Sequence, residues 1–507
     1  MSRILKNVAS NWVGFAVNAA ATLAVTPFVL RQLGPAGYGI WILSSSVIGY
    51  YGFLDLGFRA GVTQYLTRYL AAGDRERASE CLSSGIAAMS VVGVVLAILS
   101  VGAAFLVPHV FDIPSELERD AFWCVLIVGI SAGIQFALQP FGSIFTARQR
   151  FDLANAIGIM TRLLTVAGIV TALSLGYGLV GLSLATCLAS TIDYIIRWRV
   201  SRRLAALDIS RTLVSLERMK EIASFGIWNF LVSITSFVYT HVPNLLIGFF
   251  MPMAAVGHYA LAVGLSRQLS SALGPVHAVV YPAAAALDVK GDRAGLERLY
   301  HNGSRLMLLA TVSAAVLAYV WAPDFYRLWV GDKYLTGEYP SVATLFRVLL
   351  IGVVANFSSI AWQILAGAGH IRVGALTTIT GSAINLCLSA ALISSVGLLG
   401  APLTAVTLGV AIDGIASMLL VQRYVGLSAL SMLRNAYPRP LLVLVLQFAA
   451  VSFIHRLGHP NTWIELIVIG GLTGIVCAVI VVAVGTTREE RNKFVFQPLL
   501  RLRRSLI

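Results

Sequence analysis

The chain has 507 residues, of which 58% are apolar and only 12% are charged. Soluble domains are typically about a quarter charged and less than half apolar, so this composition excludes a soluble globular protein and a disordered one. The formal net charge is +14. In a soluble protein this excess would favour nucleic-acid binding, but in a membrane protein basic residues mark the cytoplasmic loops, so we predict no nucleic-acid partner.

Fourteen apolar segments, taken in chain order, are long enough to cross a membrane. Backbone amides inside lipid must form their hydrogen bonds within the segment, so we interpret each one as an α-helix. The predicted helices cover residues 11–31, 40–65, 81–107, 121–145, 153–175, 179–198, 222–250, 256–286, 305–330, 341–366, 374–395, 399–421, 440–456 and 463–485. The loops are too short for a separate catalytic domain, and no GxxxxGKS or GxxxxGKT motif of an ATPase is present.

The basic residues are distributed unevenly over the loops. Alternate loops together with the two termini contain 28 Lys and Arg residues, whereas the other loops contain five. Because basic residues accumulate on the cytoplasmic side, this bias predicts that both termini are cytoplasmic. The longest loop, residues 199–221, is the most basic, and its charge also suits anionic lipid head groups.

Two parts of the chain repeat each other at an offset of 218 or 219 residues. The matched segments are Asn11 with Asn229, Gly39-Ile-Trp41 with Gly257-His-Tyr259, Gly73-Asp74-Arg75 with Gly291-Asp292-Arg293, and Gly178-Leu-Val-Gly181 with Gly397-Leu-Leu-Gly400. Each match is weak by itself, but a register held over about 170 positions indicates an internal duplication.

The repeat determines the predicted fold class, an all-α polytopic membrane protein of about 14 helices. Each copy holds six helices, so both copies have the same topology and should be related by a pseudo-two-fold axis along the membrane normal. We predict a first lobe over residues 1–200, a basic cytoplasmic linker over 201–221, a second lobe over 222–422, and a helix hairpin with a basic tail over 423–507. Two such lobes would enclose the central cavity of an alternating-access transporter.

Charged residues inside the predicted helices are the candidates for a binding site, because ionisable groups are costly in lipid. Asp55 and Arg59 are spaced i, i+4, which fits either a self-neutralising pair or a cavity wall. Arg267 lies deep in the repeat-related helix, and Arg162 lies deep in the fifth helix. We predict that these four residues line the cavity, where the arginines favour an anionic cargo such as phosphate or pyrophosphate.

Weaker predictions concern two aspartates and two prolines. Asp193 can pair with Arg197 at i+4, which favours a structural role, whereas Asp413 has no such partner and is a candidate for ion coupling. Pro27 and Pro243 lie in the outer parts of the two lobe-leading helices, where they are either hinges or static kinks. The five cysteines are scattered without a CxxC pair, so we predict no disulfide, no metal site and no cofactor.

Several motifs resemble a known family of bacterial membrane proteins. The motifs are Leu33-Gly34-Pro35-Ala36-Gly37-Tyr38-Gly39-Ile40-Trp41, Leu54-Asp55-Leu56-Gly57-Phe58, Gln64-Tyr65 with Gly73-Asp74, and Ala147-Arg148-Gln149-Arg150-Phe151-Asp152. They are similar to segments of Wzx-type polysaccharide-biosynthesis flippases of the multidrug/oligosaccharidyl-lipid/polysaccharide exporter superfamily. The resemblance extends to most of the chain through its length, its span count and its division into six, six and two helices.

The resemblance implies an inner-membrane flippase that moves a polyprenyl-pyrophosphate-linked oligosaccharide from the cytoplasmic to the periplasmic leaflet without breaking a covalent bond. In related lipid II flippases, arginines on helices 1, 2 and 8 line the cavity. Arg59 and Arg267 match helices 2 and 8, but the only arginine of helix 1, Arg31, lies at its outer end, which favours another glycan. These relatives hold the lipid tail in a groove of helices 13 and 14, which the apolar segment Leu441-Leu-Val-Leu-Val-Leu446 fits. The implied partners are membrane lipids, a polysaccharide polymerase and a chain-length regulator.

Two alternatives stay open at this point. A multidrug antiporter of the same superfamily would have acidic residues in its cavity, about 12 spans and a cationic cargo. A membrane-embedded glycan polymerase or glycosyltransferase would have a sizeable extracytoplasmic loop or an acidic motif near the membrane surface. Asp112, Glu116 and Glu118 cluster in one short outer loop, but a solvated face explains them without catalysis. We therefore predict a transporter with no catalytic residues, not an enzyme.

Overall fold

A computed structural model describes residues 2–49, 57–272, 274–355 and 359–491. All regular structure in these residues is helical, as the sequence predicts. Nine helical stretches among them are long and apolar enough to cross a membrane, so the chain is a multi-span membrane protein. One of the nine, Ile371–Tyr424, covers 54 residues and is interrupted near Gly397, which has φ 71°. Nine is therefore not the number of crossings, and the figure of 14 stays a prediction.

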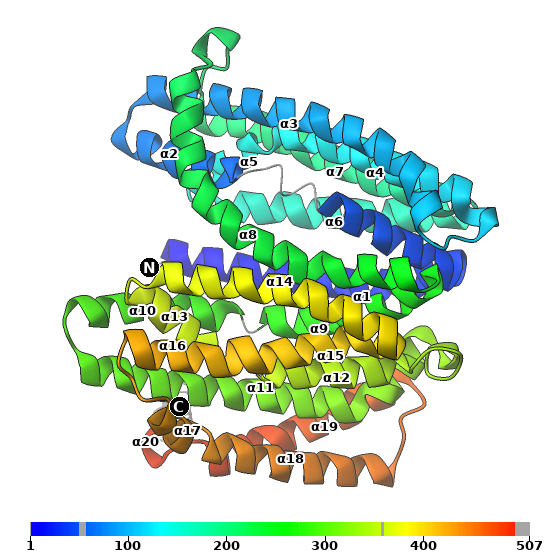
Figure 1. Cartoon of the computed structure of the whole chain (residues 1–507), viewed down its shortest axis with the longest axis vertical. Coiled ribbons are helices and arrows are strands. Elements are labelled where there is room, and N and C mark those ends of the chain that lie inside the picture. Colours follow the sequence, from blue (N-terminus) through cyan, green and yellow to red (C-terminus); the bar gives the residue numbers. More distant parts are fainter. Residues whose placement is uncertain (1, 50–56, 273, 356–358, 492–507) are drawn as a thin grey trace, which may run out of the picture. The chain divides into compact units, whose positions relative to one another are not determined.

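The chain divides into two compact units, Met1–Ala260 and Leu261–Ile507. Within the first unit, α3, α4 and α7 pack side by side, and α1 packs on α6 (Figure 1). The helices of this unit are α1 (Ser2–Gly49), α2 (Phe58–Ala72), α3 (Arg75–Val110), α4 (Glu118–Leu138), α5 (Pro140–Ala147), α6 (Phe151–Ser174), α7 (Gly178–Ala205), α8 (Leu216–Phe250) and the first part of α9 (Met253–Ala272).

The second unit begins within α9 and has α11 at its centre. This long helix contacts α10, α12, α13, α17, α18 and α19. The further helices of the unit are α10 (Gly274–Val289), α11 (Arg293–Val330), α12 (Val342–Ala355), α13 (Ser359–Gly367), α14 (Ile371–Val396), α15 (Gly400–Leu408), α16 (Ser417–Tyr424), α17 (Ala429–Ala436), α18 (Pro438–Leu457), α19 (Trp463–Ile480) and α20 (Arg488–Arg491).

Two of the helices predicted as continuous are interrupted. The prediction for 40–65 is wrong because α1 ends at Gly49 and α2 begins only after Gly57, whose φ of 76° cannot belong to a right-handed helix. The predicted helix 121–145 is divided into α4 and α5 at Pro140, which has no N–H to continue the hydrogen-bond ladder. In the second copy, the predicted helices 256–286 and 341–366 each contain residues outside the described ones, so their continuity stays a prediction.

The two copies of the repeat build equivalent buried cores, which confirms the internal duplication. In the first unit, one core joins α2, α3 and α5, and in the second unit another joins α10, α11 and α13. Four residues of the first core are followed by core residues of the second exactly one repeat later: Val62 by Val280, Leu66 by Ala284, Ala78 by Leu296, and Leu82 by Tyr300.

The loops before α3 and α11 also share one local structure. Gly73 and Gly291 both have positive φ, 75° and 67°, and each is followed by an aspartate that caps the next helix. The side chain of Asp74 accepts a hydrogen bond from the backbone N–H of Arg77 at 3.0 Å. The matching bond of the second copy goes to a backbone N–H that is likewise three residues after the cap, at 2.7 Å. The sequence match at this loop therefore reflects a repeated helix cap.

The division between the two units falls within α9, later than the predicted linker at 201–221. Helix α8 packs against α1, α2 and α3, so contacts group it with the first unit. Its first turn is held by Arg218, which donates to Glu80 at 3.0 Å and to Glu221 at 2.8 Å. Hydrogen bonds to Glu221 and Glu80 raise the pKa of Arg218, so this linker arginine is a fixed ion-pair partner. The boundaries of the predicted lobes stay a prediction.

The C-terminal hairpin of α18 and α19 packs on α11. Apolar side chains of all three helices form one buried cluster, which includes Val316 of α11, Val451 of α18 and Leu466 of α19. Gln447 of α18 is fully buried and donates hydrogen bonds to Ser313 Oγ at 2.9 Å and to the Cys477 carbonyl at 3.0 Å. One amide nitrogen thus joins the three helices, while the amide oxygen of Gln447 is buried without a hydrogen-bond partner.

Two glycines at equivalent positions of the repeat contact each other inside the first unit. A Cβ atom on Gly39 of α1 would lie 2.0 Å from the carbonyl oxygen of Met253, and one on Gly257 of α9 would lie 2.6 Å from that of Pro35. The two backbones therefore approach as closely as small residues allow in membrane helix packing.

We predict that Gly39→Ala destabilises the protein, because the added methyl must push two backbones apart, at a cost of about 1–3 kcal/mol. The measurement is thermal unfolding of the purified protein in detergent. The matched control is Gly102→Ala on an exposed face of α3, where nothing lies within 4 Å of the added atom. Equal melting temperatures of the two variants would contradict the prediction.

Candidate functional site

A polar cavity of about 630 Å³ lies within the first unit, between α2, α5 and α7. It adjoins the helix interruptions at Gly57 and Pro140. Arg59 is the second residue of α2, directly after the break at Gly57, and Gln139 precedes Pro140 at the start of α5. Non-helical backbone at membrane depth is tolerated where it lines a cavity, so these breaks and the cavity belong together.

The cavity wall from α7 is formed by an ion pair. Arg197 Nε donates to Asp193 Oδ2 at 2.5 Å, and a second guanidinium nitrogen donates to Oδ1 at 3.3 Å. Thr161 of α6 also donates to Asp193 Oδ1, at 2.8 Å. The predicted pairing of Asp193 with Arg197 is confirmed, and the carboxylate has partners on both oxygens.

The charged groups of the lining give the cavity a positive balance. Arg59 and Arg197 contribute two guanidiniums, and Asp193 contributes the one carboxylate among the lining residues. Arg59 is solvent-exposed and stands in the first turn of α2, where the helix dipole is also positive. A cation at a helix N-terminus raises the local positive potential, which an anionic ligand would neutralise.

The remaining lining residues are mostly polar and neutral. The hydroxyls of Thr63 on α2 and Ser143 on α5 lie 2.8 Å apart and share a hydrogen bond. The other polar side chains of the lining are Gln64, Gln139, Thr146 and Tyr194. Amides and hydroxyls both donate and accept, so the wall can exchange hydrogen bonds with the hydroxyls of a sugar.

Of the other predicted cavity residues, those that the structure describes do not line this cavity. Arg162 of α6 donates to the Thr22 hydroxyl of α1 at 2.7 Å, which makes it an interhelical contact. Arg267 lies on an exposed face of α9 in the second unit. Asp55 lies outside the described residues, so its placement beside Arg59 stays a prediction.

Asp413, the candidate for ion coupling, has an unusual backbone environment. It lies in a π-helical stretch, Gly409–Ala416, between α15 and α16. Such stretches are rare and often occur at functional sites. Its Oδ1 accepts a hydrogen bond from Trp362 Nε1 of α13 at 3.2 Å. The carboxylate is thus held by a neutral indole, whereas its counterpart Asp193 is held by an arginine.

The two prolines predicted as hinges lie inside helices. Helix α1 continues through Pro27, and its non-helical residue is Gly34, with φ 69°. Helix α8 likewise continues through Pro243. The next residue, Asn244, is buried and donates to Ser46 of α1 at 3.1 Å. Whether either proline acts as a hinge stays a prediction.

The site contains residues that sequence reasoning did not place there. Arg197 counts toward the cytoplasmic charge bias, and Gln64, Gln139 and Tyr194 are neutral residues without a distinctive pattern. Two signals are present in the sequence: Asp193 and Arg197 stand i, i+4 on one helix face, and Pro140 marks the break that brings Gln139 to the cavity.

Comparison with known proteins identifies the family. The profile of the polysaccharide biosynthesis protein family matches residues 28–337, more than half of the chain. The chain belongs to this family. Its curated relatives include the membrane protein EpsK of Bacillus subtilis, 23% identical over 96% of both chains. Another is a Shigella flexneri protein assigned as an O-antigen transporter, 21% identical over 79% of this chain and 94% of that protein.

Two transporters of known structure have a fold similar to that of this chain. The lipid II flippase MurJ in an inward closed conformation matches with a TM-score of 0.70, over 92% of this chain and 98% of MurJ, at 16% identity. An inward-facing multidrug resistance MATE transporter of the MOP superfamily matches with a TM-score of 0.68, over 83% and 99%, at 15% identity. The fold is that of the MOP superfamily, as the sequence resemblance implies.

We predict that Asp193→Ala destabilises the first unit, because it leaves Arg197 without its carboxylate. The side chains are 12% and 20% exposed, so we expect a loss of about 1–3 kcal/mol, below that of a fully buried pair. Unfolding in detergent measures it. The control Arg77→Ala removes an exposed pair at 3.5 Å and should cost under about 1 kcal/mol. If both variants lose the same stability, the pair at the cavity is not structural.

Proposed function

We propose that this protein is a flippase that moves a polyprenyl-pyrophosphate-linked oligosaccharide from the cytoplasmic to the periplasmic leaflet by alternating access. The observation that supports this most is the cavity of the first unit, whose lining carries two guanidiniums, one carboxylate and a set of neutral hydrogen-bonding groups. Guanidinium forks suit phosphate oxygens, and hydroxyl and amide groups suit sugars. The relatives assigned as an O-antigen transporter and a lipid II flippase fit the same class of cargo.

Within this proposal, Arg59 binds the pyrophosphate. Asp193 balances the charge of Arg197 and also accepts a hydrogen bond from Thr161. The net positive charge of the lining therefore corresponds to Arg59 on α2. Arg267 and Asp55 are proposed as further cargo-contacting residues. Arg162 is proposed to act there only if its bond to Thr22 opens during transport.

The lipid tail requires an apolar surface, and the second unit has a suitable cavity. This cavity of about 340 Å³ is lined only by apolar residues of α9, α11, α12 and α19. Phe325 of α11 and Leu466 of α19 lie on its walls, and Gly470 of α19 leaves one part of the wall without a side chain. We propose that this apolar cavity accepts part of the polyprenyl chain, in agreement with the groove expected beside the hairpin.

The remaining parts of the mechanism are proposals of the same kind. Asp413, in its π-helical stretch, is the candidate for coupling transport to an ion, and Pro27 and Pro243 are the candidate hinges. Both termini are proposed to face the cytoplasm of a bacterial inner-membrane protein. A polysaccharide polymerase and a chain-length regulator are the partners that such a role implies.

A multidrug antiporter is the second candidate function, because the fold matches a MATE transporter with a TM-score of 0.68. A cationic drug would favour a cavity in which carboxylates outnumber cations. The lining of the cavity in the first unit has the opposite balance. This balance supports an anionic cargo over a cationic drug.

We predict that Arg59→Ala slows transfer of a lipid-linked oligosaccharide about 10- to 100-fold, since a hydrogen bond to a charged group contributes about 1.5–3 kcal/mol. The measurement is head-group transfer between leaflets of proteoliposomes containing the purified protein. Arg59→Lys keeps the charge but loses the fork, so we expect an intermediate rate.

The matched control for Arg59 is Arg119→Ala, which removes an exposed arginine at the start of α4, far along the chain from the lining residues. This variant should transport at the wild-type rate. A folded Arg59→Ala protein with wild-type transfer would contradict the proposed role of Arg59. Absence of transfer by the wild-type protein, with authentic substrate supplied, would contradict the flippase itself.

We predict that Gly470→Phe slows transport of the lipid-linked substrate about tenfold, because the new ring fills the apolar cavity. The control is Gly471→Phe on the next residue of α19, which is exposed and does not line the cavity. Neither glycine has other atoms within 4 Å of a new Cβ, so both variants should fold. Equal transfer rates of the two variants would show that this cavity does not accept the tail.

A further inference from the structure

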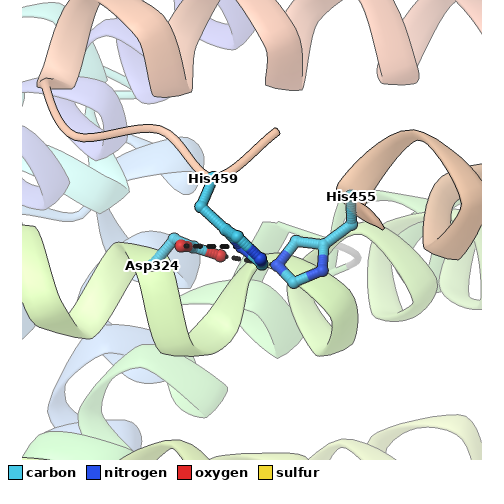
Figure 2. A group of neighbouring side chains, drawn as sticks. All are labelled: Asp324, His455 and His459. Carbon is cyan, nitrogen blue, oxygen red and sulfur yellow. Dashed lines mark hydrogen bonds and ion pairs between the residues drawn. The ribbon is translucent and has the colours of Figure 1, made fainter. Parts of the chain in front are cut away.

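Two histidines and an aspartate meet at one end of the second unit, beside residues that line its apolar cavity. Asp324 lies near the C-terminal end of α11, His455 near the C-terminal end of α18, and His459 in the short loop to α19. Figure 2 shows the two imidazole rings facing the carboxylate of Asp324 from different segments. Asp324 and a pair of histidines more than 100 residues later thus place ligand-type atoms at one point.

The distances within this group fit a small metal ion. His455 Nε2 lies 2.7 Å from Asp324 Oδ2, and His459 Nδ1 lies 3.8 Å from Asp324 Oδ1. The three ligand atoms all lie within 4.8 Å of one another. Ligands at about 2.0 Å from a tetrahedral zinc ion are about 3.3 Å apart, so shifts of a few tenths of an ångström to about 1 Å would enclose the ion.

Neighbouring residues hold the Asp324 carboxylate in a position that suits metal binding. Asp324 is 4% exposed, so its charge requires partners. Arg327 donates to Asp324 Oδ1 at 3.2 Å and to the Pro460 carbonyl at 2.7 Å. One guanidinium thus orients the carboxylate and fixes the loop that carries His459. A ligating carboxylate held by an outer hydrogen bond is the usual arrangement at metal sites.

The ligand types of Asp324, His455 and His459 favour some metal ions over others. Two imidazoles with one carboxylate suit zinc and its transition-metal neighbours, whereas calcium and magnesium prefer oxygen ligands alone. The side chain of His459 is 59% exposed, which gives an ion an entry path and leaves a fourth coordination position for water.

We propose that Asp324, His455 and His459 form a zinc-binding site that fastens the α18–α19 hairpin to α11. This proposal departs from the prediction of no metal site, which considered only the cysteines. The site stands on geometry alone and does not rest on the proposed flippase activity. It has a structural consequence, because Trp321 and Phe325 of α11 line the apolar cavity whose opposite wall comes from α19. A bound ion would fix the distance between these two walls.

The test is Zn²⁺ titration of the purified, tag-free protein in detergent by isothermal calorimetry, after removal of metal with a chelator. We expect one ion per chain with micromolar or tighter affinity, and no competition from excess Mg²⁺. His459→Ala should weaken binding at least about tenfold, since loss of even an outer-shell partner costs 10–100-fold. His459 is exposed, so this variant should fold. His455→Ala and Asp324→Asn should weaken binding in the same way.

The control variant is His109→Ala, which removes an exposed histidine near the end of α3 in the other unit. It should bind Zn²⁺ like the wild type. A second readout is thermal unfolding, because an ion that binds only the folded state raises the melting temperature of the wild type but not of His459→Ala. Absence of saturable binding at micromolar Zn²⁺, or unchanged affinity in both histidine variants, would overturn the proposal. The group would then be a hydrogen-bonded cluster alone.

Discussion

The constraint on which this structure depends is the need of every backbone amide in lipid to find a hydrogen-bond partner. It requires the membrane-crossing segments of the described residues to be helical, and it makes each interruption of a helix costly. The first unit concentrates two interruptions, at Gly57 and Pro140, around one polar cavity. The backbone N–H and C=O groups that lose their partners at a helix break thus lie at the cavity, where polar side chains and a polar ligand can form hydrogen bonds with them. The position of the candidate site follows from where the helices stop.

Comparison of the two copies separates the residues that both copies need for packing from those that occur in one copy alone. Both copies preserve the capped loop and the apolar core that follows it, because packing depends on these residues in either copy. The charged positions have diverged. One repeat after Arg59 the sequence has His277, and Asp413 of the second copy bonds to an indole where Asp193 of the first bonds to an arginine. The second unit has an apolar cavity beside the hairpin, lined by α9, α11, α12 and α19. The core match pairs α2 with α10, so this cavity is not the equivalent of the polar one.

Composition and periodicity are sufficient for the fold class, because a chain so apolar has few ways to satisfy its backbone in a membrane. The register of the repeat is also visible in the sequence, because the Gly-Asp pair that precedes a capped helix occurs in both copies. Helix interruptions were missed because apolar residues continue through them, so hydropathy does not change at Gly57 or Pro140.

The site was harder to predict, because a side chain's role there depends on which helices meet. The charge of Arg59 predicts its place in the cavity, whereas the spacing of Asp193 to Arg197 predicts only a structural pair. Gln139 and Tyr194 have no such signal, because neutral polar residues are common in membrane helices and only the packing of α2, α5 and α7 brings these two together. The group of Asp324, His455 and His459 is not predictable for the same reason, since more than 100 residues separate Asp324 from the two histidines along the chain.

The contact between Gly39 and Gly257 has a consequence for how such a protein can change over generations. Contact between equivalent positions is the geometry of an isologous dimer interface. In an unduplicated precursor that paired with its own copy, any side chain at this position would have entered the interface twice, so only the smallest residue was tolerated. Once the two copies are joined in one chain, each glycine can be replaced separately. Both glycines are still present in this chain. The close approach of the two backbones therefore constrains both positions, because an added side chain in either copy would meet the other backbone.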